Sequence, residues 1–361
     1  MGVFFGRRNE RPIGVDVSET GVRLLQLTTS GDGLAVVAAA FEPLPAKLKI
    51  ESPVYHEQVK LAVQRGLRHG KFRGQRCVSV MPGSMLLCKN LRLPPMPADE
   101  LASAVEWEAA DRFRIDRGRA SVQFINAGEV SQGDDVKLEL IVMASQAGLV
   151  EAHVSSLIEA GLRPAAVDCV PAALARIDHA VGHAGDDARV VIELGNQATQ
   201  VLIYRDRRIQ FYKSIDGGLQ QIDASLSGEL KCTLDEAIAR REGAKPEQIG
   251  ADLLEASRTA VRDLGREIGL CLRYFGVTFR GSRPAAGTMI GVGATAWLAQ
   301  IISDASGFDL QVRNPLAGVD TSAVVDEIPL GEETAWAVAA GLSLRELRPG
   351  KKPATRREVA A

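Results

Sequence analysis

The chain has 361 residues, a formal net charge of −2, 46% hydrophobic residues and 24% charged residues. This composition is typical of a folded protein with a substantial core, and it excludes a disordered, collagen-like or coiled-coil chain. The balanced charge and the aromatic content of 5% also argue against a nucleic-acid-binding protein, which would show a basic excess or many stacking side chains.

Five cysteines form no C-x-x-C pair and five histidines show no metal-binding spacing. We therefore expect reduced cysteines, no metal site and a cytoplasmic location. The longest apolar stretches, 34–41 and 334–344, are too short to cross a bilayer. Residues 1–10 are interpreted as a flexible tail, although Phe4, Phe5 and the arginines after them could also touch an anionic membrane.

In chain order, the first predicted element is the apolar strand 13–17, followed by a polar turn, the strand 22–27 and the strand 34–41. The same opening returns 177 residues later, because aligning Asp16 with Glu193 places Ile13 on Val190 and Leu24 on Val201. An internal repeat of this kind predicts two related lobes, although strand–turn–strand units also recur by chance.

A different unit separates the two repeats. Its predicted elements are two strands, a proline-rich break, a helix with an early acidic turn and two further strands, at 77–81, 86–93, 94–97, 98–113, 121–127 and 136–144. This order predicts a small α+β insert in the first lobe. A helix over 146–160 then returns the chain to that lobe.

Helical patterns dominate the second half, around a strand that enters the glycine turn 291–294. The predicted helices are 54–69 in the first lobe and 219–230, 234–242, 253–275, 296–305 and 335–344 in the second. The predicted parts are a tail 1–10, a first lobe 11–76 and 145–188, an insert 77–144, a second lobe 189–347 and a disordered tail 348–361.

Several segments together resemble the PilM family of type IV pilus assembly proteins, which is related to the cell-division protein FtsA. They are 13–27, Val80-Met81-Pro82-Gly83-Ser84, Leu91-Arg92-Leu93-Pro94-Pro95-Met96-Pro97, Val105-Glu106-Trp107-Glu108-Ala109-Ala110, 161–168, 191–195 and 314–318. The resemblance runs from about Arg11 to Leu347. It implies an α/β, two-lobed, actin-like (duplicated ribonuclease H-like) fold with a strand–helix–strand–strand insert of the SHS2 type.

The resemblance also implies a function: a cytoplasmic scaffold in the inner-membrane complex that builds type IV pili and supports twitching motility. In this family a groove between the insert and its neighbouring lobe takes the N-terminal cytoplasmic tail of the inner-membrane protein PilN, an extended peptide. Membrane contact is then indirect, and other pilus assembly proteins and a homo-oligomer are further expected partners. The candidate partner-binding residues are Ser84, Leu86, Leu91, Leu93, Pro95, Trp107 and Phe113.

An actin-like fold further implies two facing hairpins that hold ATP and Mg²⁺. The phosphate and Mg²⁺ candidates are Asp16, Ser18, Glu19, Thr20, Glu193, Gly195, Asn196, Gln197 and Thr199. The adenosine candidates are Gly217, Gly218, Arg241, Gly291, Gly293 and Ala294.

Four positions depart from the family pattern, namely Ser18, Glu193, Val292 and Ile238. A Cβ and an added carboxylate in the first turn oppose a close approach of phosphate. ATP binding and its loss therefore both stay open, and we expect weak ATPase activity at most, with no catalytic residue assigned. The alternatives to a pilus scaffold are a type II secretion L-like or MSHA-type component and an ATPase or sugar kinase of the same fold.

Overall fold

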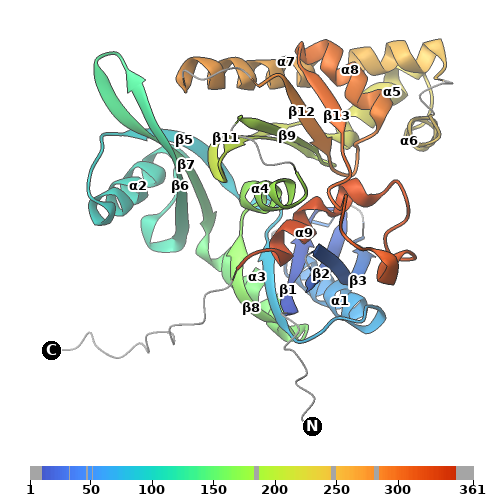
Figure 1. The fold of residues 1–361 in the computed structure, drawn as a ribbon, viewed down its shortest axis with the longest axis horizontal. Coiled ribbons are helices and arrows are strands. Elements are labelled where there is room, and N and C mark those ends of the chain that lie inside the picture. The colour runs from blue at the N-terminus through green and yellow to red at the C-terminus, as the bar shows by residue number, and fades with distance from the viewer. Residues whose placement is uncertain are drawn as a thin grey trace, which may run out of the picture.

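Two five-stranded sheets with the same strand order form the framework of this computed structural model (Figure 1). It describes residues 10–31, 33–45, 48–50, 52–182, 187–244, 249–279 and 284–346. The first sheet has the order β3-β2-β1-β4-β8, and the second β11-β10-β9-β12-β13. Their strands are Glu10–Val17, Gly21–Ser30, Gly33–Pro43, Arg76–Val80 and Arg163–Asp168 (β1 to β4 and β8), then Arg189–Leu194, Ala198–Arg205, Arg208–Asp216, Ala286–Ile290 and Asp309–Val312 (β9 to β13).

The strand registers of the two sheets confirm the predicted duplication. In the first sheet Val15 pairs with Leu24 and Asp16 with Arg23. In the second sheet Ile192 pairs with Val201 and Glu193 with Gln200, at the positions that the sequence repeat assigns. Each sheet continues with two parallel strands on the far side of its first strand. The chain is therefore built twice on one plan.

The predicted insert is a three-stranded sheet with one helix, in the strand order β5-β7-β6. Its elements are β5 (Leu87–Leu93), α2 (Ala98–Phe113), β6 (Ala120–Gln132) and β7 (Asp135–Gln146). In α2, Leu101, Val105 and Ala109 recur every four residues and are buried against the sheet. The sequence order of strand, helix, strand and strand is confirmed. The predicted start of the insert at residue 77 is wrong, because β4 pairs in parallel with β1 and β8 and so belongs to the first large sheet.

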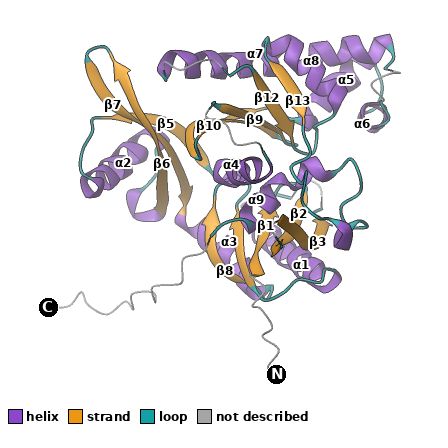
Figure 2. Ribbon diagram, viewed as in Figure 1, coloured by secondary structure: helices purple, strands orange, loops and turns teal. Residues whose placement is uncertain are grey.

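The helices cover both faces of each large sheet, as Figure 2 shows by element type. Their bounds are α1 Pro53–His69, α3 Ala147–Glu159, α4 Val170–Val181, α5 Leu219–Leu230, α6 Leu234–Glu242, α7 Ala251–Thr278, α8 Ala296–Ser306 and α9 Ala337–Ser343. Short 3₁₀ turns lie at 83–85, 117–119, 322–324 and 333–336. The single helix predicted over 335–344 is thus a 3₁₀ turn followed by α9.

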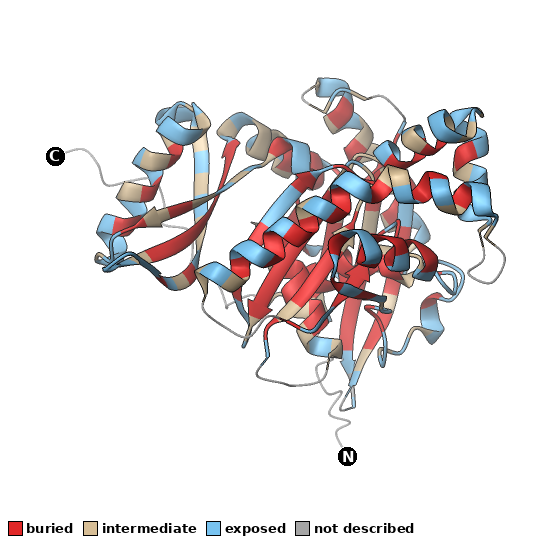
Figure 3. Ribbon diagram, turned by 90° about the horizontal axis from the view of Figure 1, so that it is seen from above, coloured by how far each residue is buried: buried red, intermediate tan, exposed pale blue. Residues whose placement is uncertain are grey.

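Three large clusters of buried side chains hold the lobes together, and the buried strands stand out in Figure 3. One lies under α1 and α3, and another under α5, α7 and α8. The third joins the lobes, because Leu174 of α4 packs with Val78 of the first sheet and Leu202 of the second. The floor between the lobes is therefore a continuous apolar core.

Helix α9 belongs spatially to the first sheet although it follows the second in the chain. A Cβ at Gly14 of β1 would overlap the carbonyl oxygen of Ala339, and a Cβ at Gly341 would overlap that of Ala173 in α4. Glycine at these two positions lets α9 lie directly on the backbone of its neighbours.

Within the described ranges, no helix is both long enough and apolar enough to cross a membrane. The predicted tail 1–10 lies outside these ranges except for Glu10, which is in β1, and the predicted tail 348–361 lies wholly outside them.

Candidate functional site

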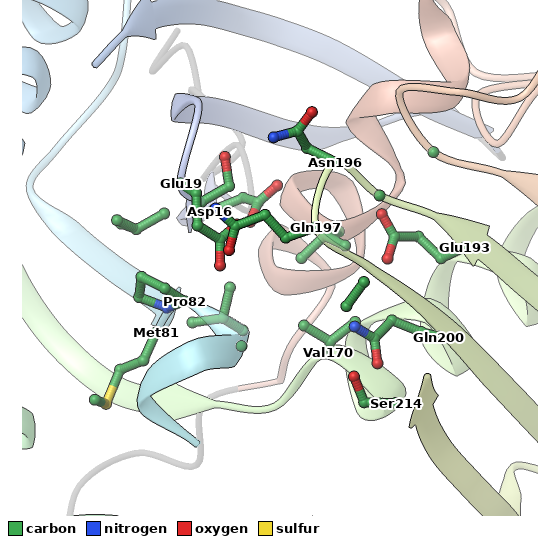
Figure 4. Close-up of a pocket in the computed structure, with 18 of the residues that line it drawn as sticks. Asp16, Glu19, Met81, Pro82, Val170, Glu193, Asn196, Gln197, Gln200 and Ser214 are labelled. Carbon is green, nitrogen blue, oxygen red and sulfur yellow. The ribbon is translucent and has the colours of Figure 1, made fainter. Parts of the chain in front are cut away.

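A cleft of about 290 Å³ opens between the two lobes, where β1 and β9 end. The turn after β1 contributes Asp16, Ser18, Glu19 and Thr20, and the turn after β9 contributes Glu193, Gly195, Asn196 and Gln197. Figure 4 shows Asp16 and Glu19 on one side and Glu193, Asn196 and Gln197 on the other. All but Thr199 of the phosphate and Mg²⁺ candidates thus share one cleft, at the small end of the range for ligand sites.

Both turns that line this cleft contain backbone N–H groups without an acceptor in the described chain. Ser18 N donates to Gly21 O at 3.0 Å and Gly195 N to Ala198 O at 3.1 Å, which closes each turn. In the described chain, the amides of Glu19, Thr20, Asn196 and Gln197 donate no hydrogen bond. Successive free amides of this kind form an anion-binding concavity.

The two acids that end β1 and β9 are perturbed by their surroundings. Burial raises the pKa of Asp16 to about 6, with Arg23 opposing and Glu19 adding to the shift. Burial raises the pKa of Glu193 to about 8, and the charges of Asp16 and Glu19 add to it. The carboxyl groups are therefore close enough to repel each other in a poorly hydrated space.

Arg23 of β2 lies beside these acids and was not among the residues predicted from the sequence. Its guanidinium is 4.4 Å from the centre of the Phe41 ring. Burial lowers its pKa, while Asp16, Glu193 and Glu332 oppose that change. The hairpin register could have identified it, since Arg23 stands seven residues after Asp16 as Gln200 stands seven after Glu193.

Acidic side chains outnumber basic ones in the lining of the cleft. Among its described residues Arg23 is the one basic side chain, against five acids: Asp16, Glu19, Asp168, Glu193 and Asp216. Of these, Asp168 is neutralised by Arg176 and Arg345. The remaining acids would repel a bare polyphosphate and attract a divalent cation. The residues fit a phosphate group that enters together with Mg²⁺.

Helix α5 supports the second turn from behind. The amides of Leu219 and Gln220, at the start of the helix, donate to Gly195 O at 3.0 Å and Asn196 O at 2.9 Å. A Cβ at Gly218 would lie 2.5 Å from Gly195 O, so only glycine fits there. These contacts fix the turn that carries the free amides.

Thr199 and Gly217 also support this turn rather than line the cleft. The buried Thr199 hydroxyl donates to Gly217 O at 2.7 Å, and Gly217 N donates to Gln197 O at 3.1 Å. Gly217 has φ +138°, a conformation that favours glycine.

The adenosine candidates are scattered by the fold. Gly291 lines the cleft with φ +105°, and its amide donates to Thr334 O at 3.1 Å. Gly293 and Ala294 lie outside the lining, and a Cβ at Gly293 would meet Leu219 and Leu194. Arg241 is buried and forms a bidentate ion pair with Asp223, at 2.6 and 3.2 Å, that joins α6 to α5.

The partner candidates divide into buried and exposed residues. Leu91 and Leu93 are buried in the insert core, and Phe113 packs against that core. Ser84 and Leu86 line the cleft, where Ser84 Oγ donates to Glu19 Oε1 at 3.3 Å.

The other two candidates face outward. Pro95 is exposed, and the side chain of Trp107 on α2 is 63% exposed.

A buried polar network joins the insert to the second lobe. Glu139 of β7 is fully buried and accepts hydrogen bonds from Arg92 Nε at 2.6 Å and Asn90 Nδ2 at 2.9 Å. The Tyr274 hydroxyl of α7 donates to the same carboxylate at 3.0 Å. The end of α7 is thereby held against the insert sheet.

Two sheets of identical topology, two facing hairpins at a central cleft and an inserted small domain define the actin-like ATPase class of folds. Residues 14–347 match the sequence model of a family described as type IV pilus assembly protein PilM. The chain therefore belongs to the PilM family of type IV pilus assembly proteins, as the resemblance predicted.

Solved structures agree on the fold. A structure described as the PilM–PilN type IV pilus biogenesis complex matches with a TM-score of 0.75 and 20% identity, over 94% of this chain and 99% of that chain. The ethanolamine utilization protein EutJ from Carboxydothermus hydrogenoformans matches at 0.53 and 14%, over 92% and 89%. A ROK family glucokinase from Streptomyces griseus, in complex with glucose and AMPPNP, matches at 0.50 and 11%, over 92% and 98%.

Proposed function

We propose that this protein is a cytoplasmic scaffold of a type IV pilus assembly machine, which docks the N-terminal cytoplasmic tail of a PilN-like inner-membrane protein. Membership of the PilM family and the likeness to a PilM–PilN complex support this role. The protein then resides at the inner membrane through its partner. Its cleft adds a second, nucleotide-binding role.

The exposed Trp107 is the observation that carries the docking proposal. A large aromatic side chain on the outside of α2 is unusual, and such residues are enriched where interfaces form. The Arg117 guanidinium lies 3.7 Å from the centre of its ring and holds the indole in place. A hollow of about 50 Å³, lined by Glu106, Ala110 and Arg117, adjoins this residue.

An extended peptide also finds unpaired backbone beside Trp107. Strand β6 is at the edge of the insert sheet, and its first residues, Ala120 and Val122, line the same small hollow. A tail that adds to this edge would gain backbone hydrogen bonds and place a side chain beside the indole.

The docking test uses a synthetic peptide with the N-terminal cytoplasmic sequence of a PilN-like protein from the same organism. We expect Trp107→Ala to weaken binding about tenfold or more in fluorescence anisotropy, as truncation of a central aromatic does. Val277→Ala, which alters a side chain that is 82% exposed on α7, is the matched control. Equal affinities for the two variants would overturn this location.

In the cleft, the chain offers a phosphate site and two carboxylates. The free amides of the two turns would hold phosphate oxygens, while Asp16 and Glu193 would hold Mg²⁺, directly or through water. When bound, Mg²⁺ would neutralise the phosphate charge that the acidic lining opposes. The adenosine side is less developed, because Arg241 is engaged by Asp223 and Val292 is apolar. We therefore propose weak Mg²⁺–ATP binding.

A further inference from the structure

A second cavity, of about 500 Å³, lies at the opposite end of β1 from the cleft. It is lined by Glu10, Arg11 and Pro12 of β1, Thr29, the loop 73–76, Arg345 and Glu346. We call it the basic hollow, since four arginines face two carboxylates in it. Strand β1, whose first residues line it, lies on the side of the molecule away from α7 (Figure 1). Neither the family resemblance nor the cleft accounts for this hollow.

The arginines of the basic hollow are short of acidic partners. In the described chain Arg11, Arg73 and Arg76 form no ion pair, whereas Arg345 pairs with Asp168 at 2.8 Å. Arg11 Nε is buried and has no hydrogen-bond partner among the residues that the structure describes. Its Nη1 makes a long contact of 3.5 Å with Leu344 O. A buried donor without an acceptor calls for an explanation, and a bound anion supplies one.

The buried side chain of Gln26 holds two arginine-bearing segments of the basic hollow in place. Gln26 is only 1% exposed, and its Nε2 donates to Arg11 O at 2.9 Å and to Arg73 O at 2.8 Å. Its Oε1 accepts from Arg73 N at 2.8 Å. The two arginine-bearing segments are therefore fixed to each other by one amide, which preorganises the hollow.

A second buried polar group ties the end of α9 to the hollow. Ser343 Oγ donates to Pro12 O at 2.7 Å and accepts from Leu27 N at 2.9 Å. This fixes Arg345, two residues further on, beside β1.

The two terminal segments of the sequence are basic. Residues 1–9 have a net charge of +2 and residues 347–361 of +4, in a chain whose net charge is −2. Residues 10–346 therefore carry −8. Both basic segments attach to residues that line the basic hollow, Glu10 and Glu346.

We propose that the basic hollow binds the phosphate headgroups of anionic phospholipids, so that the first lobe lies directly on the membrane surface. One small anion would satisfy Arg11, but the charge of +6 on the adjoining segments extends well beyond a single ligand and suits a charged surface. Each basic residue near such a surface adds to the electrostatic attraction. Phe4 and Phe5 in residues 1–9 add side chains of the type that enters the interface.

The experiment measures sedimentation of the full chain, without any partner peptide, with two kinds of vesicle. We expect binding to vesicles made of equal parts phosphatidylglycerol and phosphatidylcholine, no binding to phosphatidylcholine alone, and release at about 1 M salt. Arg73→Glu with Arg76→Glu should lower the bound fraction about tenfold or more. Arg262→Glu with Arg266→Glu, which makes the same charge change on exposed positions of α7, should not.

Thermal melting checks that both variants are folded, and Arg73→Gln with Arg76→Gln replaces the first pair if it melts early. Failure of the unaltered chain to sediment would overturn the proposal. So would undiminished binding of the Arg73 and Arg76 variant, which would assign binding to the terminal segments alone. Saturable binding of glycerol phosphate without vesicle binding would make the hollow a site for a soluble anion instead. None of these results depends on docking of the PilN-like tail.

Discussion

Asp16 of β1 and Arg23 of β2 face each other at the floor of the cleft, and Glu193 and Gln200 occupy the equivalent positions of the second sheet. In the first lobe the carboxylate of Asp16 is therefore paired with the cation of Arg23. In the second lobe the carboxyl group of Glu193 is paired with the neutral amide of Gln200. This asymmetry explains why burial and neighbouring charges raise the pKa of Glu193 further than that of Asp16.

The acidity of Glu193 should make the stability of the protein depend on pH. Because its folded-state pKa of about 8 exceeds the ordinary value of 4.5, the folded chain binds more protons than the unfolded chain between these values, and stability falls as pH rises through them. Glu193→Gln should remove that loss and raise the free energy of unfolding at pH 8 by on the order of 2 kcal/mol. Urea titrations at pH 5 and pH 8 measure it. Parallel pH profiles for both proteins would contradict the interpretation.

Nucleotide binding should require Mg²⁺. Acids outnumber bases in the cleft lining and oppose ATP alone, so we expect calorimetry to show binding with Mg²⁺ and about tenfold weaker or no binding with EDTA. Asp16→Asn should weaken Mg²⁺–ATP binding by a similar factor. Asp206→Asn, in the exposed turn between β10 and β11, is the control. Equal affinity with and without Mg²⁺ would refute the assignment of the two acids.

Gly218 should tolerate no side chain. In Gly218→Ala the new Cβ would press on the Gly195 and Asn196 carbonyl oxygens, so we expect a loss of about 1–3 kcal/mol of stability and weaker ATP binding. Gly228→Ala is the matched control, since a Cβ at that position in α5 meets nothing within 4 Å. That change should stabilise the protein by about 0.5–1 kcal/mol. Chemical denaturation of the two variants measures these changes in stability. Equal stability of Gly218→Ala and Gly228→Ala would contradict the prediction.

Arg241 distinguishes a structural role from an adenosine-binding role. Arg241→Met leaves Asp223 buried and unpaired, which should cost about 3–5 kcal/mol of stability. Adding Asp223→Leu should restore most of it. If the double variant is stable and binds Mg²⁺–ATP as the unaltered chain does, Arg241 serves the packing of α5 on α6. A large loss of affinity in that variant would instead place Arg241 at the adenosine.

The repeated hairpins show how much of the fold and of the cleft could be predicted from the sequence. Because a hairpin register follows from a short turn, the alignment of Asp16 with Glu193 predicted both the duplication and the shared cleft. The proline-rich break 94–97 and the early acidic turn likewise predicted α2 with its bounds. These are local patterns, which can be recognised in a single sequence.

Long-range contacts could not be predicted in this way. The sequence next to Arg241 does not predict its ion pair with Asp223. The sequence next to Leu91 does not show whether Leu91 is a buried strand residue or a docking residue. Strand β13 was missed because its alternation of polar and apolar residues extends over only four residues. The basic hollow combines three segments that are distant in the chain, so it appears only once the chain is folded.

The place of α9 has a consequence for synthesis on the ribosome. The first sheet is translated early, yet the helix that lies on Gly14 and Ala173 comes from residues 337–343. One face of the first lobe therefore stays uncovered until almost the whole polypeptide has left the ribosome. The first lobe can therefore be completed only after the second lobe has been translated. A nascent chain interrupted before α9 would expose the uncovered apolar face of the first lobe to chaperones and proteases.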